Sequence, residues 1–263
     1  MNDDKEQIAK KSLGQHWLTD DDALQAMCDA ADLSPDDTVL EIGPGLGALT
    51  DLLIRRCHSV IAVEKDEALA TALPKKIVSE KLRVVSQDIL TFNLNDVPSG
   101  YKIVANIPYY LTNNLIRILS ITTNAPALAV LLVQKEVAER VTAKPGQMSL
   151  LSVTAQFYWE TSLGRIVKAE SFTPAPKIDS QILVLQRRQQ ALFPDVDPDA
   201  FFIAARAGFA QRRKTLLNSL HAGLHVDKTK LTDALERVSI DPSTRAQALT
   251  MEQWHAIYKS LIR

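Results

Sequence analysis

The feature that most constrains the fold is a short apolar run that leads directly into glycines. Residues 38–42 are followed by Gly43, Gly45 and Gly47, and a helix-like stretch begins at Ala48. Glycines between a strand and a helix let the backbone turn tightly and approach a ligand, while the helix start supplies free N–H groups. The segment predicts a strand–loop–helix unit with a ligand site at the end of its strand.

Glu64 supports the ligand interpretation, because it closes the next apolar run, 59–63, at the end of the next predicted strand. A carboxylate there can accept hydrogen bonds from both ribose hydroxyls of a nucleotide-like ligand. A tight turn with a surface glutamate is the structural alternative. Glu41, just before the glycines, is expected to orient the loop rather than to touch the ligand.

Further apolar runs alternate with helix-like stretches and predict an α/β fold. Runs at 82–85, 102–105 and 129–133 are separated by helix-like residues 66–78 and 113–120. This alternation is typical of a parallel sheet covered by helices on both faces. Residues 148–158 and 182–186 are also rich in β-forming residues, and we expect them to close the same sheet.

A Pro/Asp-rich break at 193–198 divides the chain. Beyond it, helices are predicted over 198–220, 227–238 and 250–261. We therefore expect an α/β domain over residues 1–190 and a small helical domain over 191–263. Within the first, residues 1–20 form an N-terminal arm, whose Trp17 and Leu18 are expected to dock onto the body.

Charge, cysteines and hydropathy narrow the class of protein. The net charge of −1 gives no sign of a polyanionic partner, although residues 187–263 are more basic than the rest. Cys28 and Cys57 show no paired spacing and are predicted to be buried and reduced. No secretory signal or membrane-spanning run is visible, and no histidine has metal-ligand spacing. We expect a cytoplasmic protein with no metal.

Two more polar positions follow predicted strands. Asp88 could accept a hydrogen bond from the amino group of an adenine ring beside the N–H of Ile89, although such an aspartate is more often a turn residue. Asn106-Ile-Pro-Tyr109 offers the Asn106 oxygen and the carbonyl of Ile107, held by Pro108, to an amine on a flat base, on which Tyr109 would stack. The alternative is a proline-stabilised strand end.

Other candidates lie further along the chain. The rigid loop 172–180 presents Phe172 as a second wall for a flipped base and Lys177 as a phosphate contact, although a hairpin connection explains its prolines equally well. A predicted helix carries basic residues that could grip a phosphate backbone or simply solvate a helix face, namely Arg206, Arg212, Arg213 and Lys214.

Together these motifs resemble a known family, the S-adenosylmethionine-dependent small-subunit ribosomal RNA adenine dimethyltransferases. The resemblance covers almost the whole chain. It rests on Lys-Lys-Ser-Leu-Gly-Gln-His-Trp-Leu18, the segments 41–47, 63–64 and 87–88, Asn106-Ile-Pro-Tyr109, and the segments 172–180 and 206–220. His16 stands where the family commonly has Asn, and segment 145–150 lacks a Tyr-Gly that often precedes Leu-Ser-Val.

The resemblance implies a Rossmann-like class I methyltransferase sheet with a small all-helical C-terminal domain. It also implies dimethylation of N6 on two adjacent adenosines in the 3′-terminal hairpin loop of small-subunit (16S) rRNA, within a pre-ribosomal particle, by a monomer. By the same resemblance, S-adenosylmethionine would be held by His16, Leu18, Gly43, Glu64, Asp88 and Asn106, and the base by Asn106, Tyr109 and Phe172.

Three other functions remain open at this point. The related erythromycin-resistance enzymes methylate large-subunit rRNA, and the basic segment 211–220 argues against that substrate. DNA adenine methyltransferases usually carry Asp-Pro-Pro or Asn-Pro-Pro in place of Asn-Ile-Pro. An RNA-binding assembly or transcription factor could keep the fold without catalysis.

Overall fold

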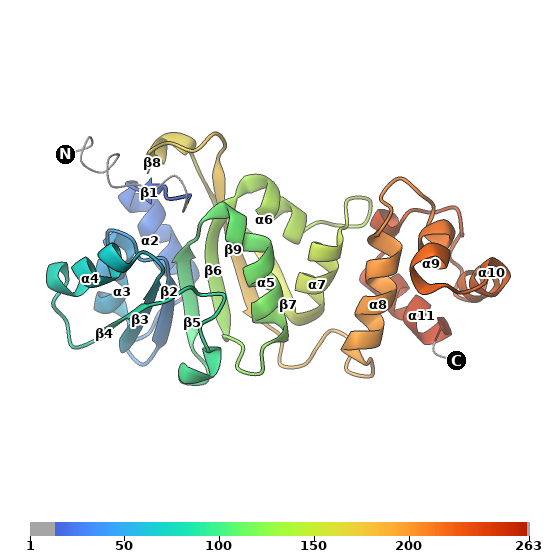
Figure 1. Cartoon of the computed structure of the whole chain (residues 1–263), viewed down its shortest axis with the longest axis horizontal. Helices are drawn as coiled ribbons and strands as arrows, with labels where there is room; N and C mark the ends of the chain where they lie inside the picture. The colour runs from blue at the N-terminus through green and yellow to red at the C-terminus, as the bar shows by residue number, and fades with distance from the viewer. Residues whose placement is uncertain (1–13, 262–263) are drawn as a thin grey trace. The chain divides into compact units, whose positions relative to one another are not determined.

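The computed structural model describes residues 14–261, and the chain divides into two compact units (Figure 1). The first comprises the residues up to 138 together with 161–187, and the second comprises 139–160 and the residues from 188 onward. The segment 139–160 thus belongs with the C-terminal helices, which the expected boundary at residue 190 did not anticipate. Residues 1–13, most of the expected N-terminal arm, lie outside the described part.

A seven-stranded sheet forms the frame of the first unit, in the order β4-β3-β2-β5-β6-β9-β7. The neighbours from β4 to β6 pair in parallel, whereas β9 runs antiparallel to β6. The strands predicted between residues 38 and 133 are confirmed. The bounds are β2 (Thr38–Ile42), β3 (Ser59–Glu64), β4 (Leu82–Ser86), β5 (Lys102–Asn106), β6 (Leu128–Gln134), β7 (Trp159–Val167) and β9 (Ser180–Arg187).

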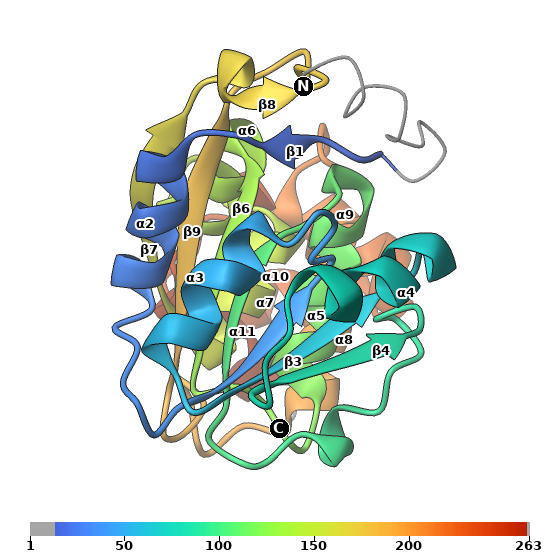
Figure 2. The same cartoon turned by 90° about the vertical axis from the view of Figure 1, so that its left-hand side faces the viewer.

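Helices cover both faces of this sheet, as the alternation predicted. Val39, Val60 and Val104 share one core cluster with side chains of α2 (Asp21–Ala30) and α3 (Ala48–Arg56). The alternate residues Leu40 and Ile61 point to the opposite face and are also buried. Figure 2 shows α2 and α3 on one side of the strands and α5 on the other. The remaining helices here are α4 (Glu67–Lys76) and α5 (Thr112–Ile121).

A two-stranded ribbon joins distant parts of the first unit. β1 (Trp17–Leu18) pairs antiparallel with β8 (Phe172–Thr173), so that Leu18 lies opposite Phe172. Leu18 is buried in the core. The expected docking of Trp17 and Leu18 onto the body is confirmed, and it brings this part of the N-terminal arm beside the loop 172–180.

The second unit is a helical cluster around aromatic side chains. Phe157 lies 5.0 Å from Phe201 and 5.2 Å from Phe202, measured between ring centroids. The chain enters this unit within α6 (Lys135–Val141). Its other helices are α7 (Leu150–Tyr158), α8 (Pro198–Phe209), α9 (Leu216–Leu224), α10 (Lys228–Arg237) and α11 (Met251–Leu261).

Two element predictions are wrong. Residues 148–158 are mostly helical, because Ser149 forms a capping box with Ser152 that starts α7 and outweighs the β-forming side chains. The single helix expected over 198–220 is two helices, since the Thr215 hydroxyl accepts from the N–H of Asn218 and begins α9. Residues 210–215 connect the two.

Two predictions from composition can be compared directly with the structure. Cys28 and Cys57 are both buried and free, as expected. Among the helices in residues 14–261, none is long and apolar enough to cross a membrane.

Close packing of α8 on α9 generates a stability prediction. A Cβ at Gly223 would lie 2.6 Å from Cβ and 2.8 Å from Cα of Ala207. Alanine usually stabilises a helix by about 1 kcal/mol relative to glycine, but overpacking costs about 1–3 kcal/mol. We expect Gly223→Ala to lower the free energy of unfolding in urea denaturation. The control is Asn218→Ala in the same helix, where alanine is again the better helix former and the free energy of unfolding should not fall. A higher free energy of unfolding in Gly223→Ala would refute the close contact.

Candidate functional site

The glycine-rich loop between β2 and α3 adopts backbone conformations that favour glycine. Gly43, Gly45 and Gly47 have φ angles of 68°, 56° and 84°. A Cβ at Gly45 would lie 2.3 Å from the ring of Trp17, which packs against the loop. Gly47 caps α3 without a side-chain hydrogen bond, so that no side chain at the cap competes for its first N–H groups. The predicted strand–glycine–helix unit is confirmed.

Glu64 connects this loop to the end of β3. One carboxylate oxygen accepts the N–H of Gly45 at 3.1 Å and the other accepts the N–H of Asp66 at 2.9 Å. Burial raises the pKa of Glu64, while these two backbone donors oppose the rise. The carboxylate lines the cavity described below and keeps lone pairs for further donors.

Glu41 is a second buried carboxyl group beside the first. It is 1% exposed and accepts a hydrogen bond of 2.7 Å from the hydroxyl of Thr50 in α3. Burial raises the pKa of Glu41 to about 8, against the Thr50 hydrogen bond and with a smaller contribution from the charge of Glu64. Glu41 is therefore protonated at neutral pH and fastens the end of β2 to α3.

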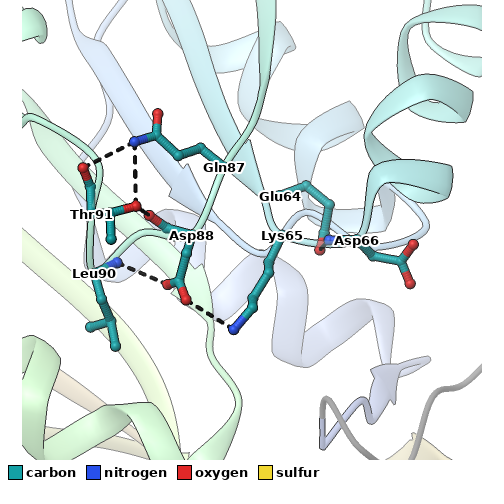
Figure 3. Close-up of polar contacts among 7 residues, drawn as sticks. All are labelled: Glu64, Lys65, Asp66, Gln87, Asp88, Leu90 and Thr91. Atoms are coloured by element: carbon teal, nitrogen blue, oxygen red, sulfur yellow. Dashed lines mark hydrogen bonds and ion pairs between the residues drawn. The ribbon is translucent and has the colours of Figure 1, made fainter.

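Asp88 stands at the neighbouring strand end, after β4 (Figure 3). One oxygen accepts the N–H of Leu90 at 3.0 Å, and the other lies 2.9 Å from the ammonium group of Lys65. Burial favours a higher pKa for Asp88, but Leu90 and Lys65 outweigh it and lower the pKa. The ammonium group of Lys65 therefore lies beside the Asp88 carboxylate, which was predicted to accept a hydrogen bond from an adenine amino group.

Asn106 ends β5 with its amide held in one orientation. Its amide nitrogen donates to the carbonyl of His16 at 3.2 Å. A carbonyl only accepts, so the NH₂ group must face it, which leaves the side-chain oxygen of Asn106 as an acceptor. The orientation of the predicted acceptor is thus set by a backbone carbonyl of the N-terminal arm.

Tyr109 lies in η3 (Tyr109–Leu111), directly after Pro108. Its hydroxyl is 2.8 Å from the hydroxyl of Ser180, and its ring is stacked on the imidazole of His16 at 5.8 Å between centroids. The Nδ1 atom of His16 lies 2.7 Å from the carbonyl of Pro174 and so carries the hydrogen. Tyr109 is held by partners from two distant segments.

One cavity in the first unit collects most of the predicted site residues. Its lining includes the following predicted positions: His16, Leu18, Gly43, Glu64, Asp88, Ile89, Asn106, Pro108 and Tyr109. Sequence reasoning missed several apolar walls and one charged residue. They are Leu24, Leu49, Leu111 and Lys65, and no local motif distinguishes them from ordinary helix or turn residues.

Two predicted residues of the loop 172–180 lie elsewhere. Phe172 is 3% exposed, belongs to the core cluster of the first unit and is not among the residues that line the cavity. Lys177 is exposed on the surface. Their assigned roles stay predictions.

The basic residues of the second unit are exposed, but they are not all helical. Arg206 lies on α8, whereas Arg212, Arg213 and Lys214 occupy the connection 210–215. Their predicted place on a helix is wrong, because Thr215 starts a new helix. Among residues 14–261, no group of three or more His, Cys, Asp or Glu side chains could hold a metal ion.

The strand order, the glycine loop and the polar strand ends define a Rossmann-like methyltransferase fold. The chain belongs to the ribosomal RNA adenine dimethylase family, whose model matches residues 6–263. It is 44% identical over 250 residues to the ribosomal RNA small subunit methyltransferase A of Dehalococcoides mccartyi, covering 94% of this chain and 86% of the relative. It is 38% identical to the protein of that name from Moorella thermoacetica, covering 97% of this chain and 93% of the relative.

Solved structures show the same fold. A dimethyladenosine transferase from Plasmodium falciparum superposes with a TM-score of 0.81 at 26% identity, covering 92% of this chain and 96% of its own. The 23S rRNA methyltransferase ErmE superposes with a TM-score of 0.76 at 27% identity, covering 94% and 100%.

The raised pKa of Glu41 predicts a pH-dependent stability. Glutamate ionises at 4.5 when unperturbed and at about 8 in the folded chain, so folding takes up a proton between these values. The free energy of unfolding then falls as pH rises, by at most about 1.4 kcal/mol per pH unit from this group. Glu41→Gln should flatten that decline in urea denaturation between pH 5 and 8. The control is Glu80→Gln at an exposed carboxylate, which should leave the decline with pH unchanged. If the free energy of unfolding fell equally steeply with pH in both variants, a buried, protonated Glu41 would be contradicted.

Proposed function

We propose that this chain transfers methyl groups from S-adenosylmethionine to N6 of two adjacent adenosines in the 3′-terminal hairpin loop of small-subunit rRNA. The observation that carries the proposal is the fixed amide of Asn106, whose free oxygen shares one cavity with the glycine loop and Glu64. Membership of the rRNA adenine dimethylase family supports the reaction, and relatives named for the small subunit support the substrate.

The residues of the cavity fit the proposed cofactor. Left-handed glycines open the backbone to a ligand, and the buried carboxylate of Glu64 suits ribose hydroxyls. Asp88 and the N–H of Ile89 suit the adenine ring, while Leu18 and His16 line the same space. When bound, S-adenosylmethionine supplies an electrophilic methyl group on a sulfonium centre.

The remaining residues act on the target base. Conjugation draws the lone pair of an exocyclic amine into the ring, and two acceptors that hold the N–H groups make that lone pair available. The Asn106 oxygen and the carbonyl of Ile107, followed by Pro108, are these acceptors, and Tyr109 stacks on the base. The nitrogen becomes cationic when it is methylated, so its proton can leave to solvent and no general base is required.

Phe172 is proposed as the second wall of this pocket, although its ring belongs to the core cluster in this structure and would have to become accessible to reach the base. Lys177 and Arg206, with the connection 210–215, are proposed to hold the phosphate backbone of a pre-ribosomal small subunit. The protein would act as a monomer in the cytoplasm.

A second candidate substrate is large-subunit rRNA, favoured by the structural similarity to the 23S rRNA methyltransferase ErmE. The small-subunit names of the more similar relatives weigh against it. A binding role without catalysis is the third possibility, and the cavity around Asn106 argues against it.

Asn106→Ala tests the reaction and primer extension tests the substrate. Wild type should produce stops at two adjacent adenosines of small-subunit rRNA. The variant removes an acceptor for the amine, and we expect kcat to fall about 100-fold or more with RNA affinity nearly unchanged. Stops confined to the large subunit would refute the substrate. RNA binding without any methyl transfer by wild type would favour the non-catalytic role.

Reversal of Arg212, Arg213 and Lys214 to Glu tests the contact with RNA. Each lost phosphate contact should lower the slope of log affinity against log salt by about 0.7–0.9. We expect weaker binding of small-subunit particles and a flatter salt dependence in filter binding, with cofactor affinity and thermal midpoint unchanged because all three are exposed. The control reverses Lys228, Lys230 and Arg245, which are exposed in the same unit. If both triple variants keep the wild-type slope, the connection 210–215 does not contact RNA.

A further inference from the structure

The loop 172–180 is attached to the catalytic motif at two points in the first unit. The carbonyl of Pro174 accepts from His16, whose ring stacks on Tyr109. The hydroxyl of Ser180 meets the hydroxyl of Tyr109 at 2.8 Å. The second attachment reaches the side chain to which we assign the target base.

Ser180 is placed rigidly enough to act as an anchor. It is the first residue of β9 and lies opposite Gln134 in the antiparallel pairing with β6. Its side chain is fully buried. A buried hydroxyl needs a hydrogen-bond partner, and the hydroxyl of Tyr109 supplies one.

Tyr109 depends on such an anchor because its ring is only partly enclosed. The residue is half-buried, and its neighbour Tyr110 is 58% exposed. A partly exposed ring that lines a cavity can turn about its side-chain torsions unless its far end is fixed. A hydrogen bond to its hydroxyl fixes the tilt of the ring, and His16 covers part of the ring.

We propose that Ser180 is a positioning residue that sets the plane of Tyr109 for stacking on the target adenine. The proposal rests on the proposed function, in which Tyr109 holds that base. Ser180 itself touches neither base nor cofactor; it acts through the tyrosine hydroxyl. It also explains why the loop 172–180 and the motif 106–109 belong to one site although Phe172 does not line the cavity.

A double-mutant cycle tests the proposal. Ser180→Ala and Tyr109→Phe each remove one end of the same hydrogen bond, and each should lower kcat/KM for small-subunit particles by about 3- to 10-fold. Because both act through one contact, the double variant should be no worse than the poorer single variant. Cofactor affinity and thermal midpoint should stay near wild-type values in all three, which separates positioning from loss of fold.

Ser171→Ala is the matched control. Ser171 lies just before the same loop, and its hydroxyl donates to Asp20 at 3.0 Å rather than to Tyr109. It should keep the wild-type kcat/KM. Tyr109→Ala, which removes the stacking ring, should lose far more activity than Tyr109→Phe.

The outcomes separate the inference from the proposed function. Wild-type kcat/KM in Ser180→Ala, or losses that multiply in the double variant, would overturn the role of Ser180 while the methyltransferase proposal stands. Full activity in Tyr109→Ala would overturn the assignment of the base to Tyr109, and the inference with it. No methyl transfer to any rRNA by wild type would overturn the proposed function.

Discussion

The hydrogen bond from the Gly45 N–H to the carboxylate of Glu64 is the contact on which the site depends. It joins the loop after β2 to the end of β3, and it requires a left-handed glycine beneath the ring of Trp17. The loop, the buried acid and Trp17 of the N-terminal arm therefore hold one another in place. Without this bond the loop would lose its link to β3, and Glu64 would keep only the N–H of Asp66 as a donor in a buried place, which costs free energy.

Two buried carboxyl groups lie near one another, and they differ in their hydrogen-bond partners. Glu41, bonded only to the Thr50 hydroxyl, keeps its proton, whereas Glu64 receives two backbone N–H groups that favour its ionised form. One acid therefore serves as a structural link between strand and helix. The other lines the cavity and can accept hydrogen bonds from a ligand, so one acid has a structural role and the other is placed for ligand binding.

The first unit was predictable where the signal was local. The strand–glycine–helix unit and the strands that carry Glu64 and Asn106 are legible from apolar runs and glycines, and parallel strands bring their carboxyl ends to one edge. In the second unit, the non-helical connection 210–215 could not be predicted, because a cap at Thr215 interrupts a sequence with continuous helical propensity. The strand prediction for residues 148–158 was wrong for a similar reason, since the Ser149 capping box overrides the preference of β-forming side chains.

The sequence by itself determined the fold class, the family and the strand ends that carry the chemistry, because these depend on short patterns along the chain. Only the tertiary structure decided how the side chains are partnered. The orientation of the Asn106 amide depends on the carbonyl of His16, and the setting of Tyr109 depends on Ser180. The core position of Phe172 depends on pairing with β1. Such contacts join residues far apart in the chain, and their geometry follows from the packing of the whole unit.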